Sequence, residues 1–474
     1  MAKTVDFDLV VIGSGPGGYT AAIRAAQLGM KVACIEKELK LGGTCLRVGC
    51  IPSKTLLEAT EKLATARDRF SHIGIQCENV RLDLPVLMGR KDQVVSTLAN
   101  GIAALFKKNK IERIVGSAAF TSPKTLKVTS STGERTVSAA KFLIATGSAP
   151  VELPNLKFNG KHIISSDQAI ALDRVPEKMV VIGAGAIGLE LSSVWSRLGT
   201  KVTVLEIYHT TLPGADEEMS KLMERTLVQQ GITFHFEVQA TGVKEDKNGL
   251  RVRYAPKEVK PGSGATESEL AADVILVAVG RKAYTDGLNL TAAGIKTDAR
   301  GRISINQAFQ TSTPDIFAIG DVVGGAMLAH KAEEEGIAAV ELMAGKAGHV
   351  DYGTIPLVVY TAPELAWVGK TQEELTAQGV KFRIGKFRFT ANSRAMCMDE
   401  AHGLVKILAD EYSDRVLGVH ILGPQASSLI AEAVMAMAMG ASSEDIARTC
   451  HAHPSLPEAI REAALGVEGR TINS

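Results

Sequence analysis

The chain repeats one pattern of residues at an offset of 170. Val10–Gly18 reads VVIGSGPGG, and Val180–Gly188 reads VVIGAGAIG. In each copy the glycines follow an apolar run and precede a helical stretch, and a second apolar run then ends on a carboxylate, Glu36 or Glu206. This order of strand, glycine turn, helix and strand is typical of half of a parallel dinucleotide-binding sheet. The repeat therefore predicts two such α/β domains in one chain.

The three glycines of each copy have different roles. The first permits a tight turn, the second lets a pyrophosphate approach the backbone, and the third lets helix and strand pack closely. The helix N-terminus offers N–H groups to the phosphates, and the carboxylate accepts bonds from the ribose hydroxyls. A turn without a ligand is the other interpretation, but two copies in register disfavour it. The expected cofactor-binding residues are Gly13, Gly15, Gly18 and Glu36 in the first copy and Gly183, Gly185, Gly188 and Glu206 in the second.

The residues after Glu206 favour one nicotinamide cofactor. A carboxylate at the ribose repels a 2′-phosphate, and the sequence continues Ile207-Tyr208-His209 with no arginine to accommodate one. The second copy is therefore expected to bind NAD rather than NADP.

Two cysteines, Cys45 and Cys50, follow the first copy in a glycine-rich run. In a chain with only six cysteines they are expected to be a redox pair, although passive thiols are an alternative. Nicotinamide delivers a hydride, whereas a disulfide accepts two electrons through thiolate chemistry, and a flavin can do both. We therefore expect FAD at the first site, which is nearer the cysteines, and NAD at the second.

Charge and hydropathy exclude two classes of partner. The 53 basic and 52 acidic side chains nearly cancel, which gives no support to nucleic-acid binding. No segment has the roughly 18 consecutive apolar residues of a membrane helix. The sequence enters an apparent strand at Asp6, which leaves no room for a targeting peptide, so a cytoplasmic location is expected. An organellar protein whose targeting peptide was removed is the alternative.

The length of 474 residues calls for several domains. We expect an α/β fold with two Rossmann-like domains and a C-terminal α+β domain, in which a nearly all-apolar helix around Ser427–Met439 is buried in its own core or in a subunit interface. A loop tip is expected at Lys257–Gly264. The expected domains are 1–150 for FAD, 151–280 for NAD, 281–350 returning to the FAD domain, and 351–474 for dimerisation.

Four stretches resemble the flavin disulfide oxidoreductase family (class I pyridine nucleotide-disulfide oxidoreductases), and the resemblance covers essentially the whole chain. They are Gly42–Lys54 with its two cysteines, Ala145–Ser148, Thr311–Asp321, and His451–Glu458. The resemblance implies that Cys50 lies against the flavin, that Cys45 exchanges with the substrate, and that Lys54 beside the flavin pairs with Glu190. Further implied cofactor contacts are Ala118, Thr146, Gly147, Ser148, Asp321, Met327, Leu328, Ala329 and His330, with Ala240 and Gly280 as backbone positions.

Thiol–disulfide exchange needs a thiolate, so a base is required. His453 is the candidate, because imidazole titrates near neutral pH, and Glu458 is placed to orient it. The resemblance implies that this loop serves the active site of a partner subunit, which makes the enzyme a homodimer. A metal site at Cys450, His451 and His453, or a plain surface histidine, are the alternatives.

The resemblance implies oxidation of a dihydrolipoyl dithiol with reduction of NAD⁺, on acyltransferase or carrier proteins of 2-oxo-acid dehydrogenase complexes. A glutathione-type reductase is disfavoured by Glu206, and a mercuric-type one by the absence of cysteines at the C-terminal end, Gly469–Ser474. A scaffold with vestigial chemistry is disfavoured because every catalytic position is filled. One departure is Arg47, where the family has Asn. It is expected either to lower a thiol pKa or to reach solvent.

Overall fold

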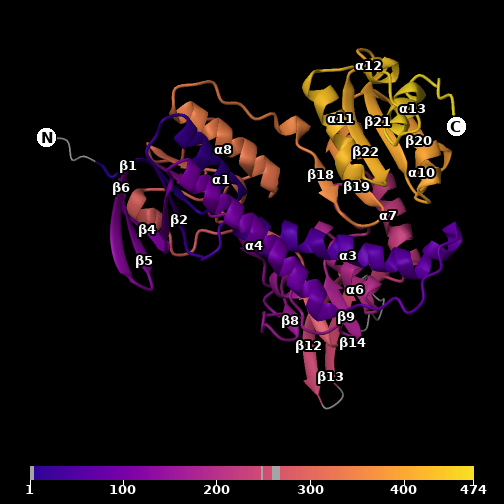
Figure 1. Cartoon of the computed structure of the whole chain (residues 1–474), viewed down its shortest axis with the longest axis horizontal. Coiled ribbons are helices and arrows are strands. Elements are labelled where there is room, and N and C mark those ends of the chain that lie inside the picture. Colours follow the sequence, from indigo (N-terminus) through magenta and orange to yellow (C-terminus); the bar gives the residue numbers. More distant parts are fainter. Residues whose placement is uncertain (1–4, 247–248, 259–266, 474) are drawn as a thin grey trace. The chain divides into compact units, whose positions relative to one another are not determined.

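The computed structural model describes residues 5–246, 249–258 and 267–473 (Figure 1). These residues divide into two compact units, each built from segments that are distant in the sequence. The first comprises Met1–Thr55, Asp83–Val151 and Gly280–Val350, and the second comprises Leu56–Leu82, Glu152–Val279 and Asp351–Ser474. The predicted loop tip at Lys257–Gly264 lies outside the described residues except for its first two positions.

The first unit is built on a seven-stranded sheet of order β3-β2-β1-β6-β5-β4, with β17 paired to β6. β3, β2, β1, β6 and β17 run parallel, whereas β4 and β5 are antiparallel additions. The strands are β1 Phe7–Ile12, β2 Val32–Glu36, β3 Glu112–Val115, β4 Ser117–Ser122, β5 Thr125–Ser130, β6 Gly133–Ile144 and β17 Ile316–Ala318, and a separate two-stranded sheet joins β7 Ser148–Pro150 to β16 Arg281–Ala283.

Helices α1 and α8 of this unit lie side by side, because glycines let their backbones approach. A Cβ on Gly336 would meet the carbonyl oxygen of Gly17 at 2.7 Å. The helices are α1 Pro16–Gln27, α2 Gly43–Val48, the start of α3 Cys50–Asp68, α4 Leu84–Lys108 and α8 Ala329–Met343, with short 3₁₀ turns η2 Leu290–Ala293 and η3 Gly320–Val322.

The second unit contains a five-stranded parallel sheet of order β11-β10-β9-β15-β8, in which β15 is entirely apolar and β9 is apolar after its first residue, Lys178. Its strands are β8 Ile163–Ile164, β9 Lys178–Ile182, β10 Lys201–Leu205, β11 Thr233–His235 and β15 Val274–Val277, with helices α5 Ser166–Ala169, α6 Ala186–Arg197 and α7 Glu217–Gln229. An antiparallel sheet joins β12 Val238–Asp246, β13 Gly249–Pro256 and β14 Ser268–Ala272. α6 begins 170 residues after α1 and has the same length, so the sequence repeat is a structural repeat.

The C-terminal part of the second unit is a five-stranded antiparallel sheet of order β18-β19-β22-β21-β20, covered by helices α11 and α13 (Figure 1). Its strands are β18 Leu357–Val359, β19 Glu364–Gly369, β20 Phe382–Arg388, β21 Leu404–Asp410 and β22 Val416–Gly423. Its helices are α9 Gln372–Ala377, α10 Ser393–Cys397, α11 Ala426–Ala438, α12 Ser443–Arg448 and α13 Glu458–Gly466, with 3₁₀ turns η4 Tyr352–Thr354 and η5 Phe389–Ala391; η1 Phe70–Ile73 follows α3 in this unit.

The predicted fold class is confirmed, with two dinucleotide-binding sheets and a C-terminal α+β domain. The predicted boundaries at 150, 280 and 350 stay a prediction. The apolar helix α11 was expected to be buried in its own core or in a subunit interface, and its residues differ in burial. Leu429 and Ala433 lie in the domain core, whereas Met435 and Met439 are 69% and 78% exposed. Among the described residues, no helix has the length and apolar character to cross a membrane.

Candidate active site

The glycine turn between β1 and α1 is held by close backbone packing. Gly13 adopts φ +100°, and a Cβ there would lie 2.4 Å from the carbonyl oxygen of Ala145. A Cβ on Gly18 would lie 2.0 Å from the carbonyl oxygen of Gly13. Because real Cβ atoms do not approach backbone so closely, both positions require glycine to form the turn itself.

The turn between β9 and α6 repeats these constraints. Gly183 adopts φ +107°, with a hypothetical Cβ 2.6 Å from the carbonyl oxygen of Ala278. The Cβ of a residue at Gly188 would lie 2.1 Å from the carbonyl oxygen of Gly183. The first and third glycines of both copies are therefore explained by the protein alone.

The middle glycine of each turn is different, because the protein leaves space around it. A Cβ on Gly185 would have no neighbour within 4 Å, and one on Gly15 would first meet Gly43 at 3.9 Å. Gly15 and Gly185 are the N-caps of α1 and α6, and no side chain caps either helix. An open approach to uncapped N–H groups fits a pyrophosphate. The residues present thus fit a dinucleotide at both turns.

Glu36 and Glu206 have matching hydrogen bonds. Glu36 is buried and accepts from the backbone N–H of Ser14 (3.0 Å), the Ser14 hydroxyl (2.7 Å) and the N–H of Glu38 (3.0 Å). Glu206 is equally buried and accepts from the N–H groups of Ala184 (2.6 Å) and Tyr208 (3.0 Å). Each carboxylate therefore ties its glycine turn to the end of the neighbouring strand. Its bond to a ribose hydroxyl stays a prediction.

The contrast between Gly185 and Gly188 gives the first testable prediction. Gly185→Ala should fold like the wild type but weaken NADH binding about tenfold or more, because the methyl group occupies only the space of the pyrophosphate. Gly188→Ala should instead fail to form the turn and yield little folded protein. Fluorescence titration with NADH and circular dichroism check the two outcomes. Wild-type NADH affinity in folded Gly185→Ala would contradict the prediction.

The side chains of Cys45 and Cys50 are hydrogen-bonded to each other. Cys45 lies on α2, and Cys50 is the first residue of α3. The hydrogen bond to Cys50 and burial raise the pKa of Cys45, whereas the charge of Lys54 opposes the rise. The pair and Lys54 are thus assembled on two consecutive helices within one unit.

The thiol helix α2 also contacts the first glycine turn. A Cβ on Gly43 would lie 2.4 Å from the Cα of Gly15, and the N–H of Gly42 donates to the carbonyl oxygen of Ser14 at 3.0 Å. Gly42 and Gly43 both have positive φ, at +108° and +60°, which favours glycine. This packing places the thiol-bearing segment directly against the turn that fits a dinucleotide.

Arg47, the departure from the family pattern, does not simply reach solvent. Its guanidinium lies 3.3 Å from Glu38, and its side chain is 22% exposed. The backbone N–H of Glu38 in turn donates to Glu36. Arg47 therefore links the thiol helix to the segment that follows β2.

The Thr311–Asp321 motif, one of the four stretches that resemble the family, ends in a polar network. Asp321 accepts from the Ser148 hydroxyl at 2.5 Å, and Arg281 donates to that hydroxyl and to the Ser148 carbonyl oxygen, both at 2.7 Å. Thr146 donates to the carbonyl oxygen of Tyr284. The sequence analysis identified Thr146, Ser148 and Asp321 but missed Arg281, which is distant in sequence from Ser148 and has no motif of its own.

The sequence analysis also missed a buried ion pair that contacts the backbone of this motif, Lys331 with Glu335. Lys331 and Glu335 are each 1% exposed and lie 2.9 Å apart. Glu335 accepts from the N–H of Gly320 at 2.7 Å, and Lys331 lies 3.3 Å and 3.2 Å from the carbonyl oxygens of Gly320 and Gly324. The i,i+4 spacing was the available signal, but such pairs usually indicate an exposed helix face. Here the pair fixes the backbone beside Asp321.

The remaining predicted cofactor residues lie as follows. Ala118 is buried in β4, and Gly147 (φ +73°) and Gly280 (φ +119°) precede β7 and β16. The carbonyl oxygen of Ala240 accepts from Asn155 at 2.9 Å. Met327 and Leu328 precede α8, and its first turn contains Ala329 and His330. Their cofactor contacts stay predictions.

Glu190 lies on α6, buried, and accepts from the N–H of Tyr360 at 3.0 Å. Its predicted pairing with Lys54 stays a prediction.

His453 and Glu458 form a dyad in the C-terminal domain. His453 Nδ1 lies 2.9 Å from Glu458 Oε1, and Glu458 Oε2 accepts from the N–H of Ser455 at 2.8 Å. Burial raises the pKa of Glu458, but these hydrogen bonds and the charges of His453 and His451 outweigh it, so the pKa lies below its usual value. The His453 side chain is 71% exposed, which leaves Nε2 accessible for proton exchange.

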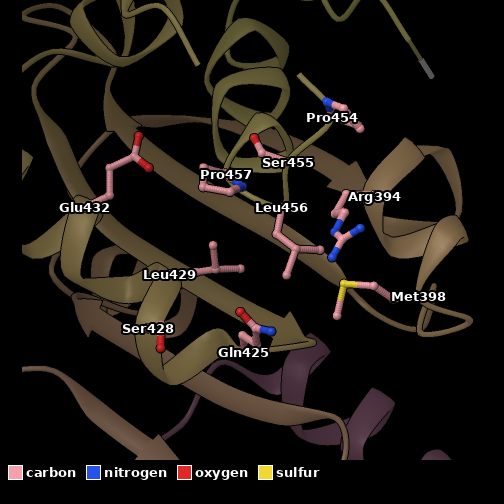
Figure 2. Close-up of a pocket in the computed structure, with 10 residues that line it drawn as sticks. All are labelled: Arg394, Met398, Gln425, Ser428, Leu429, Glu432, Pro454, Ser455, Leu456 and Pro457. Atoms are coloured by element: carbon pink, nitrogen blue, oxygen red, sulfur yellow. The ribbon is translucent and has the colours of Figure 1, made fainter. Parts of the chain in front are cut away.

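The loop after His453 borders a pocket of about 510 Å³ (Figure 2). Figure 2 shows the loop Pro454–Pro457 on one side and residues of α10 and α11 on the others, among them Arg394, Leu429 and Glu432.

The described residues contain no group of three or more His, Cys, Asp and Glu side chains able to hold a metal ion, so the geometry does not support the metal alternative at Cys450, His451 and His453.

Comparisons with known proteins agree with this geometry. Residues 7–336 match the model of the pyridine nucleotide-disulphide oxidoreductase family, and residues 355–464 match its dimerisation domain. A protein of Pisum sativum named mitochondrial dihydrolipoyl dehydrogenase is 50% identical over 98% of this chain and 92% of its own. A leghemoglobin reductase of Glycine max is 49% identical over 97% and 87%. The structure of LpdA from Mycobacterium tuberculosis matches with a TM-score of 0.88 at 27% identity, over 96% and 98%.

One expectation is corrected by these relatives. The cytoplasmic location predicted from the sequence is wrong, since relatives about 50% identical over nearly the whole chain are named mitochondrial. The prediction relied on the absence of a targeting segment before Asp6, and such a segment leaves no trace in the folded domains.

Two glycine turns fit dinucleotides, a thiol pair lies against the first, and a histidine–carboxylate dyad lies in a domain that matches a dimerisation model. The cofactors are accordingly FAD and NAD, the chain is an oxidoreductase, and it forms a homodimer. The family model matches residues 7–336, and the relative from Pisum sativum is 50% identical over 98% of the chain. The chain therefore belongs to the pyridine nucleotide-disulphide oxidoreductase family.

Proposed function

We propose that the enzyme oxidises dihydrolipoyl groups to lipoyl groups and reduces NAD⁺ to NADH. The observation that carries this is the contact between Cys45 and Cys50 on helices packed against the first glycine turn. The thiol pair exchanges with a dithiol, and the second turn, whose ribose carboxylate is Glu206, receives NAD. The name dihydrolipoyl dehydrogenase borne by several relatives supports the same substrate.

The thiol steps balance as follows. His453 takes a proton from the first substrate thiol, and the resulting thiolate attacks Cys45 of the oxidised pair. A mixed disulfide forms and Cys50 leaves as a thiolate. The second substrate thiol releases its proton to solvent, and its sulfur attacks the substrate sulfur that is bonded to Cys45. The new bond completes lipoyl disulfide, and the bond to Cys45 breaks to leave the Cys45 thiolate. His453 returns a proton to Cys45, and Glu458 holds the imidazole in place through Nδ1.

The electron pair must then leave the thiols for NAD⁺. Bound FAD supplies the group that accepts this pair and delivers a hydride to nicotinamide. Lys54 stabilises thiolate charge beside the pair, since its charge opposes the rise in the Cys45 pKa. Asp321, Ser148 and Arg281 would help to hold bound FAD, and the turn at Gly15 would hold its pyrophosphate. The net reaction converts a dithiol and NAD⁺ to a disulfide, NADH and one proton.

We further propose that the dyad of one subunit serves the thiol pair of the other. The exposed His453 side chain and the match of its domain to a dimerisation model support this arrangement. The physiological dithiol is proposed to be a lipoyl group on an acyltransferase or carrier protein of a 2-oxo-acid dehydrogenase complex. A mitochondrial location would agree with the names of the relatives.

The test is anaerobic titration of the oxidised holoenzyme with dihydrolipoamide, followed by a comparison of NAD⁺ with NADP⁺. We expect a long-wavelength absorption band from a thiolate beside the flavin, and a rate with NAD⁺ at least about 100-fold above that with NADP⁺, because Glu206 disfavours a 2′-phosphate. Absence of the band would exclude the thiol pair as the electron carrier. A preference for NADP⁺ would point to a glutathione-type reductase.

A further inference from the structure

Lys331 and Glu335 lie one helical turn apart on α8, and both side chains of their salt bridge are buried, at 1% exposure each. Glu217 and Lys221 have the same spacing on α7, but their side chains are 43% and 56% exposed. Taking two charged groups out of water is costly, and replacing a buried pair by apolar residues is often neutral or stabilising. Stability alone therefore does not explain why this pair is buried.

The pair also binds the backbone of one short segment, 320–324. Glu335 Oε2 accepts from the N–H of Gly320 at 2.7 Å. Lys331 Nζ donates to the carbonyl oxygen of Gly320 at 3.3 Å and to that of Gly324 at 3.2 Å. The salt bridge holds Lys331 Nζ and the Glu335 carboxylate together at 2.9 Å, so the two side chains act as one support for both ends of the segment.

Asp321 lies between these bonds. Its carboxylate accepts from the Ser148 hydroxyl, in the network proposed to hold FAD. Gly320, the residue before it, has φ +76°, a conformation that favours glycine. The 3₁₀ turn Gly320–Val322 has few hydrogen bonds of its own. Bonds from side chains to its backbone therefore help to fix where the Asp321 carboxylate points.

The same part of α8 contacts two further segments that are expected to bind FAD. Ala329 and His330 form the first turn of α8 and immediately precede Lys331. On another side α8 packs against α1, where a Cβ on Gly17 would lie 2.8 Å from the carbonyl oxygen of Ala332. α1 begins at the glycine turn that fits a pyrophosphate. Three segments with expected FAD contacts thus meet around the buried pair.

We propose that Lys331 and Glu335 are positioning residues for FAD. Their bonds to Gly320 and Gly324 fix the turn that presents Asp321, and the pair thereby determines how long the enzyme retains the cofactor. Neither side chain has to touch FAD. The inference rests on the role proposed for Asp321, but it does not depend on which dithiol is the substrate.

The first test compares wild-type holoenzyme with the double variant Lys331→Met/Glu335→Leu. The replacements remove both charges and all three bonds to the turn, while apolar side chains fill the space. We expect a protein with the wild-type circular dichroism spectrum that releases FAD at least about tenfold faster. Ultrafiltration of the holoenzyme, with flavin absorbance read in the filtrate, measures the release. Wild-type release from the folded variant would overturn the proposal.

A second double variant, Lys331→Met/Glu335→Gln, restores one bond without a charge. Glutamine keeps an oxygen acceptor for the N–H of Gly320, whereas the bonds from Lys331 remain lost. We expect FAD release faster than from the wild type but slower than from the leucine variant. Equal release from the two double variants would overturn the role of Glu335. If the leucine variant does not fold, wild-type release from the glutamine variant would by itself overturn the proposal.

The matched control is Lys221→Met/Glu217→Leu, which removes the exposed pair of the same spacing in the second unit. It should release FAD at the wild-type rate. Asp321→Ala should release FAD at least as fast as the leucine variant, and wild-type retention by Asp321→Ala would overturn the proposal. Failure of the wild type to oxidise dihydrolipoamide would instead overturn the proposed function, and the rates of FAD release would still decide the role of the pair.

Discussion

Cys50→Ser is expected to reduce the oxidation of dihydrolipoamide by NAD⁺ at least about 10³-fold. A serine hydroxyl has nearly the shape of the thiol but forms no disulfide with Cys45, so neither exchange nor electron transfer can proceed. The protein should remain yellow, because the glycine turn and the Ser148–Asp321–Arg281 network do not involve this sulfur. NADH formation under steady-state conditions measures the loss.

The control is Cys397→Ser. Cys397 is an exposed thiol at the end of α10 with no assigned role, so its replacement should leave the rate unchanged. If Cys50→Ser kept more than about a tenth of wild-type activity, a disulfide-based relay would be excluded.

Lys406→Met is expected to lower the free energy of unfolding by about 3–5 kcal/mol, the cost of leaving a buried carboxylate unpaired. Lys406 and Asp216 are 1% and 0% exposed, and Lys406 Nζ lies 2.7 Å from the Asp216 carboxylate and 2.7 Å from the Gln372 side chain. Asp216 is the N-cap residue of α7, whereas Lys406 lies in β21, so the pair joins two parts of the second unit.

The pH dependence of this contribution follows from Asp216. Burial raises its pKa, but His420, Lys406 and the N–H of Gln372 outweigh burial, so the pKa lies below its ordinary value. A carboxylate whose pKa is lowered by folding contributes stability above its unfolded pKa. That stability is lost as the pH falls through the folded value, so the wild type should lose its advantage over Lys406→Met in acid.

Urea unfolding followed by tryptophan fluorescence measures the effect, because Trp195 and Trp367 both lie in the second unit. Lys386→Met is the matched control. Lys386 pairs with Glu218 at 2.7 Å but is 44% exposed, so its replacement should cost less than about 1 kcal/mol. Equal losses for the two variants would show that burial does not govern the strength of these pairs.

The glycine turns illustrate what was predictable from local sequence. Gly13, Gly18, Gly183 and Gly188 were predicted from spacing, and each is required by backbone contacts of its own turn. The same holds for Cys45 and Cys50, which only four residues separate, and for His453 and Glu458, whose short loop brings them to 2.9 Å. Contacts within a short segment depend on few backbone angles, so residue order specifies them.

The residues that were missed belong to contacts between distant segments. Arg281 meets Ser148 only because β16 pairs with β7, and Lys406 meets Asp216 only because β21 faces the start of α7. Lys331 and Glu335 have spacing that usually indicates an exposed helix face, yet both are buried by the packing of α8 beneath η3. Nothing in the local sequence separates such residues from surface charges.

The sequence by itself determined the repeated dinucleotide-binding turns, the thiol pair and the histidine–carboxylate dyad, because each depends on backbone geometry over a few residues. The tertiary structure alone decided which charges are buried and which carboxylates hold the turns. Burial and ion pairing depend on which segments the topology brings together, and residue order does not record that.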